Sequence, residues 1–99
     1  MHFKTVALIG RYQDSGLDAP LRRLARHLES AGCTVLVESD TATNTGVTEF
    51  KTASYAEIGE HADLAVIMGG DGTMLGAGRI LARSNVPLIG INHGRLGFI

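Results

Sequence analysis

A five-residue apolar run, Leu64-Ala65-Val66-Ile67-Met68, ends directly at the glycine-rich segment Gly69-Gly70-Asp71-Gly72. A short, continuous apolar run with β-branched residues is typical of a strand buried on both faces of a sheet. Residues 73–83 then show a helical pattern. Open parallel sheets bind ligands beyond the carboxyl ends of their strands, and the start of a helix attracts anions. This strand, turn and helix therefore predict a phosphate-type site at one sheet edge.

The rest of the chain repeats the alternation of strand and helix. We expect Asp18 to cap a helix with Pro20 in its first turn, and Gly32 to end that helix. The small residues Gly76, Ala77 and Gly78 predict that the last helix packs closely on the sheet. The order predicts an α/β fold, with an open, mostly parallel sheet and helices on both faces. The expected strands are 6–9, 34–37, 64–68 and 87–91, the expected helices 18–31, 54–60 and 73–83, and the expected loop 39–53.

Composition excludes several classes of protein. The 99 residues suit one domain. A net charge of −1 and a pI near 6.4 give no basic footprint for nucleic acid or an anionic membrane. No apolar run approaches the roughly 20 residues that span a bilayer. One cysteine, Cys33, cannot form an internal disulfide, so we expect a reducing, cytoplasmic setting.

The glycine turn does not match two common nucleotide motifs. A Walker A motif needs Lys before Ser or Thr, but Gly72 precedes Thr73. The dinucleotide fingerprint would need glycine at position 75, which is Leu75. Asp71 therefore places a carboxylate inside a phosphate-type turn of another kind. Three roles fit this carboxylate: handling a proton or hydroxyl, binding a metal, and capping the following helix.

The segment Gly69-Gly70-Asp71-Gly72-Thr73 resembles the GGDGT signature of the NAD kinase family, a signature similar to motifs of lipid kinases and phosphofructokinases. The residues that follow, Met74 to Arg79, resemble the NAD kinase continuation. Residues 90–98 are similar to the family's N-x-G-x-L-G-F segment. The resemblance covers essentially the whole chain, but only the N-terminal, Rossmann-like domain of a NAD kinase.

This resemblance implies transfer of the γ-phosphoryl group of ATP to the 2′-hydroxyl of the adenosine ribose of NAD, with a divalent cation, usually Mg²⁺. Asp71 would accept or orient the hydroxyl proton. Backbone and hydroxyl groups of Gly70, Gly72 and Thr73 would contact phosphates or ribose. Asn92 would fix its loop or reach the nucleotide. Phe98 would pack on the adenine of NAD or belong to the core.

The resemblance also implies that residues 1–99 form one N-terminal α/β domain. The chain ends on an apolar residue, and we expect it to be truncated, without the β-rich C-terminal domain that carries half of the NAD site. The isolated fragment would then be inactive, and the full-length protein a homodimer or homotetramer in the cytoplasm. Two alternatives stay open: a lipid kinase of the diacylglycerol type, and a nucleotide-binding module without catalysis.

Other residues have plainer interpretations. Cys33 is expected to be a small buried apolar residue, and the four histidines are expected at the surface. Residues 39–53 fit a mobile lid or a simple loop. Arg11 and Arg95 are candidates for phosphate contacts, whereas Arg22, Arg23 and Arg26 are expected to form a solvated helix face.

Overall fold

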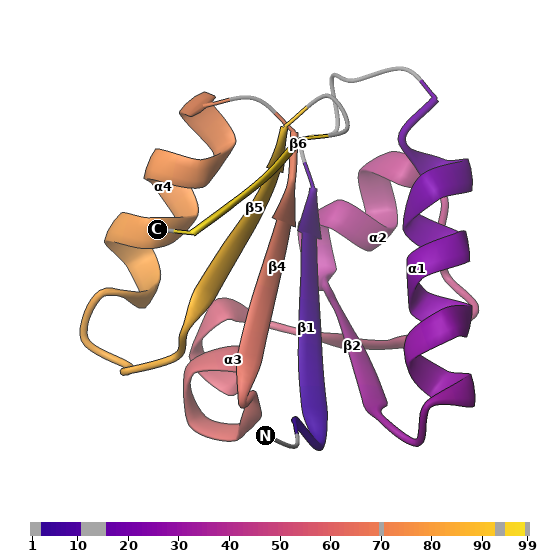
Figure 1. Cartoon of the computed structure of the whole chain (residues 1–99), viewed down its shortest axis with the longest axis horizontal. Coiled ribbons are helices and arrows are strands. Elements are labelled where there is room, and N and C mark those ends of the chain that lie inside the picture. Colours follow the sequence, from indigo (N-terminus) through magenta and orange to yellow (C-terminus); the bar gives the residue numbers. More distant parts are fainter. Residues whose placement is uncertain (1–2, 11–15, 70, 93–94, 99) are drawn as a thin grey trace.

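The protein is an α/β structure in which helices cover both faces of one six-stranded sheet (Figure 1). The computed structural model describes residues 3–10, 16–69, 71–92 and 95–98, with the backbone alone at 71, 92 and 95–98. Its elements, in chain order, are β1 (Thr5–Gly10), α1 (Asp18–Ser30), β2 (Thr34–Glu38), α2 (Ser39–Thr45), β3 (Lys51–Ala53), α3 (Tyr55–His61), β4 (Leu64–Met68), α4 (Asp71–Leu81), β5 (Leu88–Asn92) and β6 (Arg95–Phe98).

The strand order in the sheet is β3-β2-β1-β4-β5-β6. The first five strands are parallel, and β6 pairs antiparallel with β5. The open, mostly parallel sheet expected from the sequence is therefore confirmed. The chain moves outward from β1 to β3 in one direction and from β4 to β5 in the other, so the order reverses between β1 and β4.

This reversal places the helices on opposite faces, because βαβ crossovers are right-handed. Helices α1 and α2 bury side chains such as Leu21 and Ala42 on one face, against Val6 and Leu8 of β1. Helices α3 and α4 pack on the other face, where Ile58 and Ala77 contact a second apolar cluster. The alternate side chains of the buried strands thus build two cores, one on each side of the sheet.

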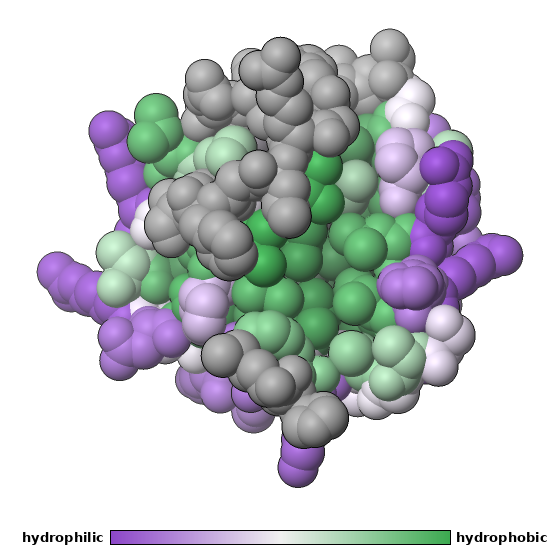
Figure 2. Space-filling view, in the orientation of Figure 1, coloured by the Kyte–Doolittle hydropathy of each residue, from purple (hydrophilic) through white to green (hydrophobic). Residues whose placement is uncertain are grey.

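The face that carries α1 and α2 is covered unevenly. Figure 2 shows an apolar area in the middle of this face, between α1 and the edge where α4 lies. An open hollow of about 450 Å³ lies there, between α1 and the ends of β4 and β5. Partly buried Ile89 and Ile91 of β5 belong to the same apolar cluster. The apolar lining of the hollow includes Pro20, Leu24, Met68 and Ile91.

The expected loop at 39–53 is wrong, because this segment contains α2 and β3. Ser, Asp, Thr and Asn are weak helix formers. Tertiary contacts override this preference: Thr41 and Ala42 are buried, Glu38 caps the first turn, and Gly46 ends the helix with a φ of 79°. Short β3 then pairs with β2.

The two helix-boundary predictions for α1 have different outcomes. Asp18 does not cap α1: the cap position is Leu17, which makes no side-chain cap hydrogen bond, and Asp18 is the first helical residue. Asp18 instead pairs with Arg22 one turn later, at 3.1 Å. Gly32, which follows the C-cap, has a φ of 92°, so its predicted role is confirmed.

The predicted close packing of α4 through its small residues is confirmed only at Ala77, which is 2% exposed. A Cβ added to Gly76 would meet no atom within 4 Å, and one added to Gly78 would make an ordinary contact with Leu88 at 3.8 Å. Helix α4 also begins earlier than expected, at Asp71. Gly76 and Gly78 are therefore not required by packing among the described residues.

Candidate functional site

The candidate site lies where the strand order reverses, at the carboxyl ends of β1, β4 and β5. Gly10 at the end of β1 pairs with Met68 of β4, and Met68 pairs with Ile91 of β5. The carboxyl ends of these three strands therefore meet at one edge of the sheet. Ligands of doubly wound sheets bind at such a reversal point.

The turn after β4 has the backbone that a glycine-rich segment allows. Gly69 has a φ of 139°, a value that side-chain-bearing residues rarely adopt, and its N–H donates to the carbonyl of Ile91 at 3.0 Å. Helix α4 begins at Asp71. The first N–H groups of a helix have no partner within it and carry partial positive charge. The turn and helix together can therefore hold an anion, as the sequence predicts.

Thr73 carries an unusual polar group within this turn. Its hydroxyl oxygen is buried and has no hydrogen-bond partner among the described residues. Buried hydroxyls are nearly always hydrogen-bonded, so an unpaired one at this edge calls for a physical reason. A bound ligand that supplies the missing partner is such a reason. Gly72, the residue before Thr73, is exposed.

The sequence-predicted site residues lie at two levels of the sheet. Asp71, Gly72, Thr73 and Asn92 gather at the carboxyl edge. Phe98 pairs with Ile89, three residues before the end of β5, so its backbone lies roughly 10 Å back from that edge. Gly70 and the side chains of Asp71, Asn92 and Phe98 lie outside the described part, as do Arg11, His93 and the Arg95 side chain.

Two residues at this edge were missed by the sequence analysis. Glu38, 5% exposed, is the last residue of β2, and Thr41, 1% exposed, lies in α2 directly after it. The Thr41 hydroxyl contacts the backbone of Gly10. Both lie in or next to the segment that was predicted to be a loop. The available signal was a carboxylate directly after an apolar strand, which resembles an N-cap except that Glu replaces the usual Ser, Thr, Asp or Asn.

Charge at the end of β2 is negative. Tyr55 is half-buried, and this desolvation, with the nearby charges of Glu38 and Asp40, raises the pKa of its hydroxyl to about 12. Tyr55 therefore stays neutral in the physiological range. Since phosphates are anionic, the acidic end of β2 favours a phosphate position nearer to the turn after β4.

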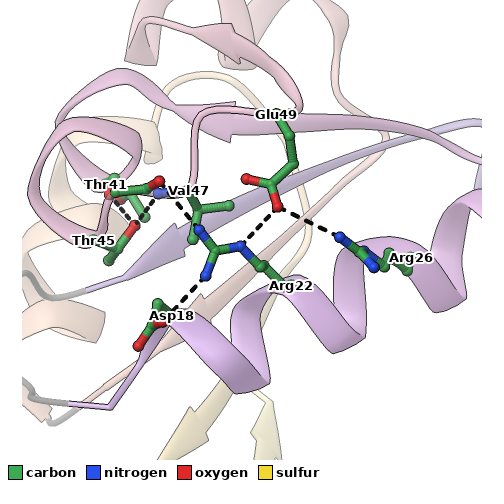
Figure 3. A network of polar contacts seen from close by, with 8 residues as sticks. Asp18, Arg22, Arg26, Thr41, Thr45, Val47 and Glu49 are labelled. Carbon is green, nitrogen blue, oxygen red and sulfur yellow. Dashed lines mark hydrogen bonds and ion pairs between the residues drawn. The ribbon is translucent and has the colours of Figure 1, made fainter.

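The basic face of α1 is not only solvated, as Figure 3 shows. Arg22 donates to Asp18 at 3.1 Å, to Glu49 at 2.7 Å and to the carbonyl of Gly46 at 3.2 Å, and Arg26 lies 3.6 Å from Glu49. The pKa of Glu49 is lowered by its own backbone hydrogen bond and by Arg22, while the pKa of Arg22 is raised by Glu49. Arg22 thus ties the segment after α2 to α1, whereas Arg23 is exposed.

The remaining plain interpretations agree with the structure at the described histidines, and only in part at Cys33, which was expected to be buried. The Cys33 thiol is partly buried and lies 3.2 Å from the carbonyl of Phe3. His27 and His61 are exposed, and His2 and His93 lie outside the described residues. Across ranges 3–10, 16–69, 71–92 and 95–98, no group of three acidic, His or Cys side chains could hold a metal ion. In the same ranges, every helix is too short or too polar to cross a membrane.

Comparisons with known proteins identify relatives of this chain. A family model described as "ATP-NAD kinase N-terminal domain" matches residues 6–99. The NAD kinase of Bordetella avium is 69% identical over all 99 residues, and that of a Polaromonas species is 55% identical over 97 residues, or 98% of the chain. In each case the chain spans 33% of the relative's length.

Among solved structures, yeast NADH kinase in complex with NADH has a similar fold. Its TM-score is 0.76 at 20% sequence identity, and the likeness covers 97% of this chain and 33% of the yeast chain. At this identity the likeness establishes the fold. The family model and the close relatives carry the assignment further: this chain belongs to the NAD kinase family, in which it corresponds to the N-terminal domain.

Proposed function

We propose that this chain is the N-terminal domain of an enzyme that phosphorylates NAD. The enzyme transfers the γ-phosphoryl group of ATP to the 2′-hydroxyl of the adenosine ribose of NAD, producing NADP and ADP. The observation that carries the proposal is the GGDGT turn at the reversal point of the sheet, within a chain that matches the family over residues 6–99.

In this proposal, Asp71 is the catalytic residue that accepts or orients the 2′-hydroxyl proton. Its position at the start of α4 supports this role, because the helix N-terminus directs backbone donors toward the same space. Phosphoryl transfer depends mainly on positioning and charge neutralisation, so a carboxylate that orients the hydroxyl is sufficient.

The neighbouring residues hold the nucleotide. Gly70 and Gly72 donate backbone N–H groups, and the Thr73 hydroxyl, which has no partner among the described residues, supplies a side-chain group. Asn92, at the end of β5, fixes its loop at the same edge. Phe98 packs on the adenine or in the core, and its backbone position beside Ile89 favours the core.

We include a divalent cation, Mg²⁺, in the proposal. Mg²⁺ is usually bound through substrate phosphates, waters and one or two carboxylates rather than through a protein cage. The turn after β4 and the start of α4 fit this mode, because a helix N-terminus at this edge can hold the phosphates that carry the cation. The cation would neutralise phosphate charge during transfer.

The chain spans about a third of the length of the curated relatives that it matches. We propose that a second, β-rich domain completes the NAD site, and that the full-length enzyme is a cytoplasmic homo-oligomer. Residues 1–99 alone should then show little activity, because transfer needs both substrates held in line.

The test is ATP- and Mg²⁺-dependent NADP formation by the full-length protein. Asp71→Asn should reduce turnover by roughly 100-fold or more, while NAD affinity changes little. Asp63→Asn is the matched control, since Asp63 accepts from the N–H groups of Lys4 and Thr5 at the opposite edge of the sheet. It should keep near-normal turnover.

Two results would contradict the proposal. Full turnover in Asp71→Asn would remove the role of Asp71. A folded, ATP-binding wild-type protein that forms no NADP would remove the activity, and phosphorylation of diacylglycerol would then be the next assay.

A further inference from the structure

Strand β1 extends further at its carboxyl end than its pairing with β2. The register with β2 ends at Leu8 and Val37, whereas the register with β4 continues to Gly10 and Met68. The backbone N–H and carbonyl of Gly10 therefore lack a β2 backbone partner. Gly10 is partly buried, and backbone groups shielded from water need partners, so a group from a neighbouring element is expected to take this place.

Thr41, on α2, supplies that partner. Its hydroxyl oxygen accepts from the Gly10 N–H at 2.9 Å and lies 3.2 Å from the Gly10 carbonyl oxygen. One buried side chain thus contacts both polar groups of the strand end, although 31 residues separate the two positions. Helix α2 replaces the missing strand residues through this hydroxyl.

Glu38 holds the Thr41 hydroxyl in place. Its Oε1 lies 2.8 Å from Thr41 Oγ1 and also accepts from the Thr41 N–H at 3.1 Å, while Oε2 accepts from the Asp40 N–H at 2.8 Å. A hydroxyl has a single proton, and the shorter distance directs it to the carboxylate. The oxygen lone pairs are then free to accept from Gly10.

Gly10 stands directly beside the strand that carries the GGDGT turn. A Cβ at Gly10 would lie 3.6 Å from the Met68 carbonyl oxygen and only 2.6 Å from Leu17 Cδ2. The end of β1 is therefore confined between α1, α2 and β4. A shift of Gly10 changes one wall of the edge at which a nucleotide would bind.

We propose that Thr41, oriented by Glu38, is a positioning residue of the nucleotide site: its hydroxyl sets the end of β1 beside the GGDGT turn. The inference rests on the proposed function for its assay, because it names a residue that shapes the same site. Thr41 acts through Gly10 and not by contact with the reacting atoms.

The experiment compares three variants of the full-length protein. Thr41→Val keeps the shape but removes the hydroxyl, and Thr41→Ser keeps the hydroxyl. Thr45→Val is the matched control, since the Thr45 hydroxyl donates to the Thr41 carbonyl at 2.6 Å one turn along α2 (Figure 3). Among the described residues, the side-chain hydrogen bonds of the Gly10 backbone go to Thr41 and not to Thr45. Kinetic constants for ATP and NAD are measured well below the thermal midpoint of each variant.

Thr41→Val should raise the KM of at least one nucleotide roughly 10-fold, with a smaller change in kcat. Thr41→Ser should restore wild-type values, and Thr45→Val should keep them despite a similar loss of stability. Equal kinetics in Thr41→Val and Thr45→Val would overturn the inference, because the hydroxyl would then be merely structural.

Two further measurements keep the test decisive. If Thr41→Val does not fold, Thr41→Cys replaces it, since a thiol is a much weaker hydrogen-bonding group; a raised KM supports the inference and a wild-type KM overturns it. If the wild-type protein forms no NADP, the proposed function fails separately. Calorimetric ATP binding by the same variants then decides the inference, with unchanged affinity in Thr41→Val overturning it.

Discussion

The connections that follow β2 and β4 reach the same edge of the sheet but satisfy their polar groups differently. After β2, the Glu38 carboxylate accepts from two backbone N–H groups and the Thr41 hydroxyl, which in turn contacts Gly10. After β4, glycine occupies the turn and the Thr73 hydroxyl is buried without a partner among the described residues.

A third connection, after β3, also has side chains that satisfy its backbone N–H groups, as the connection after β2 does. Ser54 and Glu57 form a capping box, in which each side chain accepts from the backbone N–H of the other residue. A connection whose polar groups are all paired contributes to stability, whereas one with an unpaired buried group keeps binding capacity for a ligand. The difference separates the parts of this edge whose paired side chains stabilise the fold from the part at which we propose that a nucleotide binds.

The largest expected effect on stability is at Glu38. Glu38→Ala leaves three donors without their acceptor, so we expect the free energy of unfolding to fall by about 2–4 kcal/mol. Urea denaturation measures the change. Glu29→Ala, at an exposed position on α1, should change stability by less than about 0.5 kcal/mol. An equally small change in Glu38→Ala would show that the hydrogen bonds of the Glu38 carboxylate do not stabilise the connection after β2.

Thr73→Val tests the connection after β4, where a buried hydroxyl has no partner among the described residues. Since the hydroxyl has no partner among the described residues, its replacement by a methyl group should leave the free energy of unfolding within about 0.5 kcal/mol or raise it. The KM for the nucleotide should rise roughly 5- to 10-fold, because a hydrogen bond to the ligand is lost. A loss of stability as large as that in Glu38→Ala would instead mean that the protein itself uses this hydroxyl.

Substitution by alanine should change the free energy of unfolding in opposite directions at the glycine that ends α2 and at a glycine inside α4. Gly46 ends α2 at a φ of 79°, so Gly46→Ala should lower the free energy of unfolding by about 1 kcal/mol. Gly76 lies inside α4 with open space around its Cα, so Gly76→Ala should raise it by about 0.5–1 kcal/mol. Denaturation of both variants is the measurement. A destabilised Gly76→Ala would show that α4 needs this glycine after all.

The smallest effect concerns pH at the capping box of α3. Hydrogen bonds from Ser54 lower the pKa of Glu57 below its ordinary value of 4.5. The ionised form therefore favours folding, a contribution that is present above about pH 4.5 and is lost as pH falls through the lowered pKa. The thermal midpoint of Glu57→Gln should lie slightly below that of the wild type at neutral pH and converge with it in acid. A difference that does not depend on pH would contradict this account.

Local patterns were sufficient to predict much of the fold. Strands β1, β2, β4 and β5 coincide with short apolar runs, and the burial of β1, β2 and β4 follows from continuous apolar sequence. The strand before Gly69 and the helix after it were also predicted, although α4 begins two residues earlier than expected. The family assignment followed from the GGDGT segment and from residues 90–98, and it is confirmed by the match over residues 6–99.

Local patterns failed where distant residues decide the structure. Residues 39–45 have weak helix preference, and α2 forms because Glu38 caps it and Ala42 enters a core built by β1, β2 and α1. Asp18 carries a typical capping side chain, yet it pairs with Arg22. The roles of Asp71, Asn92 and Phe98 remain predictions.

By itself, the sequence determined the strands β1, β2, β4 and β5, the helices α1, α3 and α4 and the place of the glycine turn, because apolar periodicity and glycine act over a few neighbouring residues. The tertiary structure alone decided that Thr41 would pair with Gly10, across 31 positions of sequence, and that Gly10 would lie beside Met68. Such pairings depend on how the strands are ordered in the sheet, and a local pattern carries no record of that order.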